Sequence, residues 1–119
     1  MTPTDEDRIG HIIEAIALIE KWNTEHPHDD LFRSGVIRQL EIIGEAATRL
    51  SDTVKSAHPA IEWKSITGFR IQAAHRYWDT DWSEIEQIIA EDLPILRKAL
   101  VLLREQQSEQ QVEVEMPKS

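Results

Sequence analysis

Apolar residues recur every three or four positions along most of this 119-residue chain, and this spacing limits the fold more than any other feature of the sequence. Such spacing gathers side chains on one face of an α-helix, whereas a half-buried strand needs apolar and polar residues in alternation. No sustained alternation occurs. The sequence therefore predicts an all-α fold, arranged as an antiparallel bundle of four main helices.

Helix caps and breakers divide this pattern into segments. Thr4 stands before the first segment as an N-cap, and Asp7 three residues later gives a capping-box pattern. Asp81 and Glu84 form a similar start for the last segment. Pro94 inside that segment should kink or break the helix, because proline lacks the donor of one ladder hydrogen bond. The main helices are predicted at 5–22, 31–50, 63–75 and 82–104.

The length of the chain fits a single domain, which we expect to span residues 1–104. A short helical turn is expected from Ser51, and the His58-Pro59 step should end it. The remaining segment, 105–119, is rich in glutamine and glutamate, and we expect it to form a disordered acidic tail.

Composition excludes several kinds of site. The chain has no cysteine, so disulfides, thiolate zinc sites and thiol nucleophiles are ruled out. No apolar run approaches the roughly 20 residues that a membrane span needs, and the first residues lack the apolar region of a signal peptide. The expected compartment is therefore the cytoplasm.

A net charge of −9 argues against a protein that coats nucleic acid non-specifically, because such binding depends on many lysine and arginine contacts to phosphates. A small basic cleft on an acidic body remains compatible with this charge, and Lys64, Arg70 and Arg76 are close enough in sequence to form one. The acidic surface could equally serve solubility or bind a basic partner protein.

One stretch, from Gly68 to Tyr77, gathers a fixed cation, a titratable base and the only tyrosine of the chain. Arg70 can bind a phosphate through its planar set of donors, and its charge is permanent. His75, after four intervening residues, can accept or donate a proton near neutral pH. Cleaving RNA without a metal requires a base for the ribose 2′-OH, a cation for the phosphate and an acid for the leaving oxygen.

Helix geometry leaves two arrangements open for these residues. On a regular helix Arg70 and Tyr77 are about 20° apart, whereas His75 lies about 140° from Arg70. Either the helix ends before His75, or a second copy of the chain completes the site. Ala73 and Ala74 form a low-relief stripe that could face a second copy in a symmetric dimer, or pack inside one chain.

The loop before the second helix holds the only cluster with metal-ligand chemistry. His26, His28, Asp29 and Asp30 could bind zinc or nickel weakly, but Pro27 and the polar composition favour a solvated connector. We therefore predict no metal site.

Glu41 and Glu45 lie on one face of the second predicted helix, four residues apart. Arg38 and Arg49 can explain them as partners in surface ion pairs. The alternative is a supporting role, in which one of the carboxylates orients Arg70 or a motif histidine across the bundle.

Several stretches together resemble one family, the HepT-like HEPN ribonuclease toxins. Arg70, His75 and Tyr77 match the family pattern R-x-x-x-x-H-x-Y. The other matching stretches, which extend the likeness from the first helix to about Leu103, are 38–47, His58-Pro59 with Trp63, Ile66, Gly68 and Phe69, and 92–96.

The resemblance implies a symmetric homodimer in which paired motifs form an RNA-cleaving cleft without a metal or other cofactor. It implies that Arg70 and His75 are the catalytic residues. It also implies a partner, a minimal nucleotidyltransferase antitoxin, that silences the toxin by adding AMP to Tyr77.

One position departs from the family pattern. Ile71 stands where members commonly carry a polar residue, often asparagine. Gln72 is the nearest polar substitute, but on a regular helix it points about 100° away. Ile71 favours an alternative function, a catalytically weak or inactive HEPN-fold binding module that acts through its nucleotidyltransferase partner. The RNA that is cut and the stoichiometry with the antitoxin do not follow from the sequence.

Overall fold

The structure of the chain is a computed structural model that describes residues 4–69 and 82–115, with side chains described as far as Gln106. The helices are α1 (Asp5–Glu25), α2 (Asp30–Thr48), α3 (Asp52–Ala57), α4 (Trp63–Thr67), α6 (Ser83–Gln87), the π-helix η1 (Ile88–Asp92) and α7 (Leu93–Glu115). The described residues contain no strand, which confirms the all-α class. The four-helix arrangement stays a prediction, because 70–75 lies outside the described residues.

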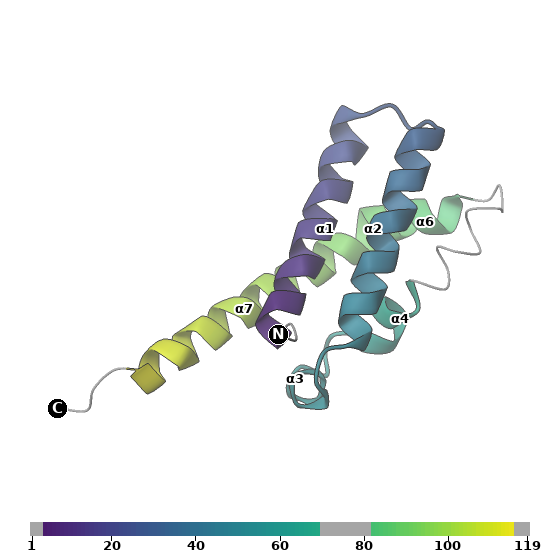
Figure 1. The fold of residues 1–119 in the computed structure, drawn as a ribbon. Helices are drawn as coiled ribbons and strands as arrows, with labels where there is room; N and C mark the ends of the chain where they lie inside the picture. Colours follow the sequence, from purple (N-terminus) through teal and green to yellow (C-terminus); the bar gives the residue numbers. More distant parts are fainter. Residues whose placement is uncertain (1–3, 70–81, 116–119) are drawn as a thin grey trace.

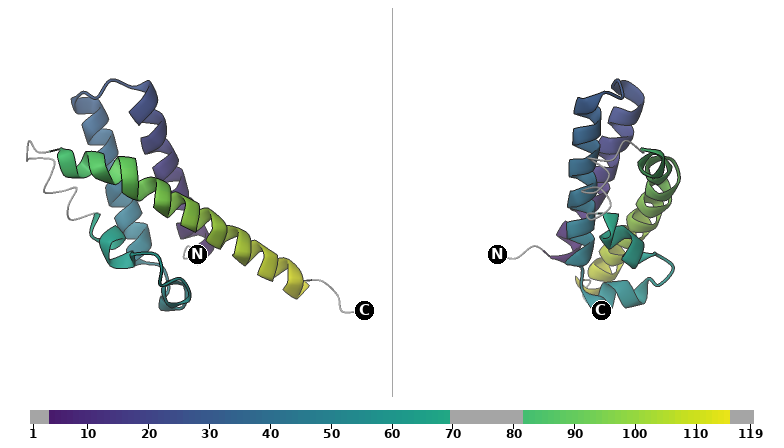
Figure 2. Two further views of the ribbon diagram at one scale, coloured as in Figure 1. Left: turned by 180° about the vertical axis from the view of Figure 1, so that it is seen from behind. Right: turned by 90° about the vertical axis from the view of Figure 1, so that its right-hand side faces the viewer.

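The arrangement is an antiparallel pair of long helices crossed by a third (Figure 1). Helices α1 and α2 stand side by side, and α6, η1 and α7 follow one diagonal path across one face of the pair (Figure 2). The short helices α3 and α4 lie near the C-terminal end of α2.

Side-chain caps begin both helices of the pair, and the sequence predicted the first of them. The Asp7 amide donates to Thr4 Oγ1 at 3.1 Å, and the Thr4 amide donates to Asp7 Oδ2 at 3.0 Å, so the capping box is confirmed. Hydrogen bonding from the Thr4 backbone, and then from its side chain, lowers the pKa of Asp7, because it favours the ionised carboxylate. At the start of α2, Asp29 accepts from the Phe32 amide at 3.0 Å.

The predicted apolar stripes form the core. Helix α1 buries one face against α2 and against α7, and each of these helices contributes side chains spaced by three or four residues. The largest of the fully buried side chains on these three helices are Ile9, Ile12, Ile16, Ile19, Val36, Leu40, Ile43, Leu93 and Leu100. Burial of these stripes is the main stabilising contribution to the fold.

The predicted helix at 82–104 is interrupted where Pro94 requires it. The Leu93 amide donates to the Ile88 carbonyl five residues back, which defines the wide turn η1. In a regular α-helix the Pro94 ring would clash with the carbonyl of Ala90, and this wider turn relieves that clash. The described part of this helix begins with Trp82 at the N-cap position, without a side-chain cap bond. The predicted cap by Asp81 stays a prediction, because Asp81 lies outside the described residues.

The last helix ends later than predicted. Helix α7 continues to Glu115, so the expected end near Arg104 and the expected disorder from 105 onward are corrected as far as Glu115. No glycine or proline interrupts the sequence from 95 to 116, and glutamine and glutamate are good helix formers. Propensity alone thus extends this helix beyond the α1–α2 pair (Figure 2).

Two sets of hydrogen bonds fix the chain that leads into the motif. Ser51 caps α3 and donates through its amide and hydroxyl to the two carboxylate oxygens of Asp5, at 3.0 and 2.6 Å, which ties α3 to the start of α1. The Trp63 indole N–H donates to the carbonyls of His58 and Lys55, at 3.1 and 3.2 Å. The start of α4 is therefore held against the end of α3.

Candidate active site

The predicted catalytic residues Arg70 and His75 lie outside the described residues, as do Tyr77 and Gln72. The structure describes instead the two ends of the segment that carries them. Phe69 on one side and Trp82 on the other are 4% and 7% exposed and belong to the hydrophobic core. The residues that flank the motif segment on both sides are therefore packed in the interior of the domain.

The helix that leads into the motif is shorter than predicted. Helix α4 ends at Thr67, and Gly68 is its C-cap, so the continuous helix predicted at 63–75 is wrong in its first part. The Thr67 hydroxyl donates to the Lys64 carbonyl at 3.0 Å, a local bond that competes with continued helix, and glycine has a low helix propensity. The break at Gly68 therefore lies before the motif, and the helix that begins at Trp63 does not continue into it.

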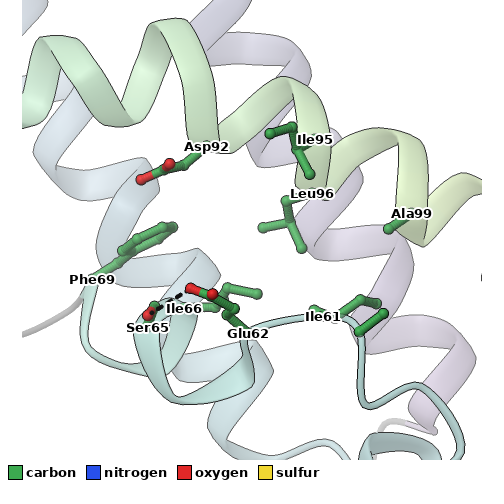
Figure 3. Close-up of a pocket in the computed structure, with 10 residues that line it drawn as sticks. Ile61, Glu62, Ser65, Ile66, Phe69, Asp92, Ile95, Leu96 and Ala99 are labelled. Atoms are coloured by element: carbon green, nitrogen blue, oxygen red, sulfur yellow. Dashed lines mark hydrogen bonds between the residues drawn. The ribbon is translucent and has the colours of Figure 1, made fainter.

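A cavity of about 510 Å³ opens beside Phe69, between α4 and α7 (Figure 3). Two carboxylates, Glu62 from the start of α4 and Asp92 from η1, point into it from opposite sides. The Ser65 hydroxyl donates to Glu62 at 3.4 Å. The remaining lining is mostly apolar: Ala60, Ile61, Ile66, Phe69, Ile95, Leu96 and Ala99.

Partial burial raises the pKa of Asp92 above its ordinary 3.8, and the neighbouring charges of Glu91 and Glu62 add to this effect. The folded chain therefore favours the protonated form of Asp92. The stability that this protonation contributes is fully present below pH 3.8 and is lost as the pH rises through the raised pKa. We predict that Asp92→Asn raises the unfolding temperature at neutral pH by no more than a few degrees.

Thermal unfolding of both proteins, followed by circular dichroism from neutral pH to below pH 3.8, tests the prediction. The gain should vanish as the pH falls below 3.8, where Asp92 is protonated in both states. Glu105→Gln, which removes an exposed carboxylate on α7, is the matched control. A lower unfolding temperature for Asp92→Asn at neutral pH would show that the ionised carboxylate makes a stabilising contact.

On the other side of the motif, Trp82 is held by a residue of α2. The Arg33 guanidinium carbon lies 4.9 Å from the centroid of the Trp82 ring, a cation–π contact. Sequence reasoning missed Arg33, because its partner is far away in the sequence and no local pattern signals the contact.

The two carboxylates proposed as supporting groups lie on α2. Glu41 pairs with Arg38 at 3.4 Å, as its sequence position predicts, and Glu45 is exposed. A role for either carboxylate toward Arg70 or His75 stays a prediction, because both partners lie outside the described residues.

The histidines of the α1–α2 loop are engaged in local structure. His26 donates through Nδ1 to the Pro27 carbonyl at 2.8 Å, and His28 donates through Nε2 to the Asn23 carbonyl at 2.9 Å. Asp29 caps α2. Within residues 4–69 and 82–106, whose side chains the structure describes, no group of three or more histidine, aspartate or glutamate side chains is arranged to hold a metal ion.

Comparison with known proteins assigns the family. The family described as "Ribonuclease HepT-like" matches residues 10–103. "Probable ribonuclease HepT" of Thermococcus cleftensis is 33% identical over 109 residues, which cover 87% of this chain and 99% of that protein. The chain belongs to the HepT-like ribonuclease family, as its motifs predicted.

Two proteins of Methanocaldococcus jannaschii are also similar. One, a "Putative RNase", is 32% identical over 79 residues, which cover 66% of this chain and 72% of the relative. The other, a "Gamma-glutamylcyclotransferase and putative RNase", is 30% identical over 103 residues, which cover 82% of this chain and 46% of that protein. The chain thus spans about half of this second relative. No solved structure matches the chain.

None of the described helices is both long and apolar enough to cross a membrane.

Proposed function

We propose that the chain is the toxin of a type II toxin–antitoxin pair, an endoribonuclease that cuts RNA in the cytoplasm without a metal. The observation that carries the proposal is the complete set Arg70, His75 and Tyr77, at the family spacing, in a chain that belongs to the HepT-like ribonucleases. Membership of the family indicates a ribonuclease, and the three residues provide the groups that the proposed reaction and its control need.

The proposed reaction uses the RNA itself as the nucleophile. A neutral His75 removes the proton of a ribose 2′-OH, and the oxygen attacks the adjacent phosphorus. The bond from phosphorus to the 5′ oxygen breaks, and a protonated His75 gives that oxygen a proton. Arg70 neutralises the charge that builds up on the phosphate oxygens. The products are a 2′,3′-cyclic phosphate and a 5′-hydroxyl.

A homodimer explains how one histidine position can serve as both base and acid. A symmetric pair of chains brings two copies of His75 to one groove, and each can be in a different protonation state. The two Arg70 side chains would then face the same phosphate from both sides. Ala73 and Ala74 suit the close approach of two motif segments, which supports this interface.

The proposed antidote is a nucleotidyltransferase that transfers AMP to Tyr77. The phenol oxygen of Tyr77 bonds to the α-phosphorus of ATP, and pyrophosphate leaves. Each added AMP carries a negative charge that competes with RNA phosphate for Arg70.

Expression of the chain alone in a bacterial host tests the toxin role. Wild-type protein should arrest growth while cellular RNA is fragmented, and co-expression of its nucleotidyltransferase should restore growth. Normal growth and intact RNA at high protein levels would favour the alternative function, a binding module without catalysis, to which Ile71 points.

A further inference from the structure

A second group of side chains suited to nucleic acid lies at the Trp82 end of the motif segment. A hollow of about 380 Å³, within the size range of sites for small ligands, opens there between the α1–α2 loop, α2, α6 and η1. Its lining includes Arg33, His28, Trp82 and Glu86. We propose that this hollow binds one nucleotide of single-stranded RNA, with Arg33 on its phosphate and His28 against its base.

Arg33 is held in place before any ligand arrives. Its guanidinium lies over the ring of Trp82 at 4.9 Å, and Trp82 itself is buried at 7% exposure. A cation–π contact uses the charge of the guanidinium and none of its N–H donors, so the planar set of donors through which arginine binds phosphate oxygens is not consumed by the indole. Because the side chain is already ordered, less conformational entropy is lost when a phosphate binds.

His28 offers a surface for a base. Its ring stacks on Phe32 with 4.2 Å between centroids and 7° between planes, and its Nε2 donates to the Asn23 carbonyl. Phe32 therefore covers one face of the imidazole. The opposite face is left open for a base, because His28 is an exposed residue. Unstacked RNA bases bind to aromatic and histidine rings of this kind.

The charges of the surroundings decide where a phosphate can lie. The net charge of the chain is −9, so RNA must find local cations. Arg38 and Arg97 are paired with Glu41 and Glu20, whereas the contact that Arg33 makes within the described part of the chain is with an uncharged ring. Glu86 lines the same hollow and repels phosphate, which confines the phosphate to the side of Arg33. A base can use the Glu86 carboxylate as an acceptor.

The subsite rests on the proposed function, because it assumes that RNA is the substrate. RNA binding can nevertheless be measured without cleavage. The probe is a short, fluorescently labelled, single-stranded RNA with every 2′-hydroxyl methylated, which attack by a 2′ oxygen cannot cut. Binding to full-length protein is followed by anisotropy in EDTA across a range of salt concentrations. Arg33→Gln should weaken binding about five- to tenfold and lower the salt slope by about 0.7, the loss of one phosphate contact on a single strand.

Matched variants separate the subsite from general effects of charge. Arg38→Gln removes a cation from the same helix, five positions further along, and should leave binding unchanged. Glu86→Gln should leave binding equal or tighten it, because it removes a repulsive charge. Unchanged helical content in Arg33→Gln, together with the changed salt slope, distinguishes a lost phosphate contact from disturbed packing on Trp82.

Cleavage of unmodified RNA gives a second readout. Arg33→Gln should raise KM and leave kcat within about twofold, because Arg33 acts away from the reacting bonds. Equal binding, salt slope and KM for Arg33→Gln and Arg38→Gln would overturn the subsite. If the wild-type protein binds RNA through Arg33 but never cuts it, the subsite stands and the proposed cleavage falls. If it neither binds nor cuts RNA, both fall.

Discussion

Replacing His75 by alanine should reduce RNA cleavage by at least about 10³-fold, while RNA binding and helical content stay close to those of the wild type. In a symmetric dimer the substitution removes both the base that activates the 2′-OH and the acid that protonates the leaving oxygen, and each contributes about 10²–10⁴ in rate. Arg70→Ala should cause a similar loss, because the charge on the phosphate is then no longer stabilised. Single-turnover cleavage of a labelled RNA measures both effects.

The control for this loss is His11→Ala, which removes an exposed histidine of α1 far from the motif in sequence. It should cleave RNA at the wild-type rate. A His75→Ala protein that retains more than about a tenth of the activity would show that another group is the acid and base, and the assignment of the site would then be wrong.

Replacing Tyr77 by phenylalanine should leave the protein toxic but prevent its neutralisation by the nucleotidyltransferase. The variant lacks the hydroxyl that we propose as the AMP acceptor, but it keeps Arg70 and His75, so it should cut RNA and remain toxic in the presence of the nucleotidyltransferase. The expected difference is large, because growth should be restored for the wild type and arrested for the variant. Intact-mass spectrometry of each protein, produced with the partner, should show additions in AMP-sized steps on the wild type alone.

Tyr77 is the only tyrosine of the chain, so any AMP on a tyrosine can be assigned without ambiguity. Peptide mapping covers threonine and serine as other acceptors. Two results would contradict the mechanism: AMP found on a residue other than Tyr77, or a Tyr77→Phe protein that the partner still silences by modification.

The helices could be predicted from the sequence because their apolar stripes must be buried. Ile9, Ile12 and Ile16 mark the face of α1, and the core contains all three. The ends of the helices were less predictable. Helix α1 continues to Glu25 and α7 to Glu115, because no strong breaker stops them where the apolar pattern stops. The π-turn before Pro94 follows from proline chemistry, although its exact width does not.

The candidate site was predictable only in its local part. Arg70, His75 and Tyr77 are neighbours in the sequence, so their spacing carries the family pattern. The contact of Arg33 with Trp82 depends on how α2 packs beside α6, and no local spacing encodes it. The same holds for the cavity at Phe69, which exists because η1 and α7 cross above α4 (Figure 3).

The most direct measurement of the central claim is cleavage of single-stranded RNA by the purified full-length chain in excess EDTA, with analysis of the product ends. A parallel reaction uses the same RNA with every 2′-hydroxyl methylated. We predict that the unmodified RNA is cut to products with 2′,3′-cyclic phosphate and 5′-hydroxyl ends, and that the methylated RNA stays intact. Unmodified RNA that survives excess protein, or is cut only after Mg²⁺ is added, would contradict the account.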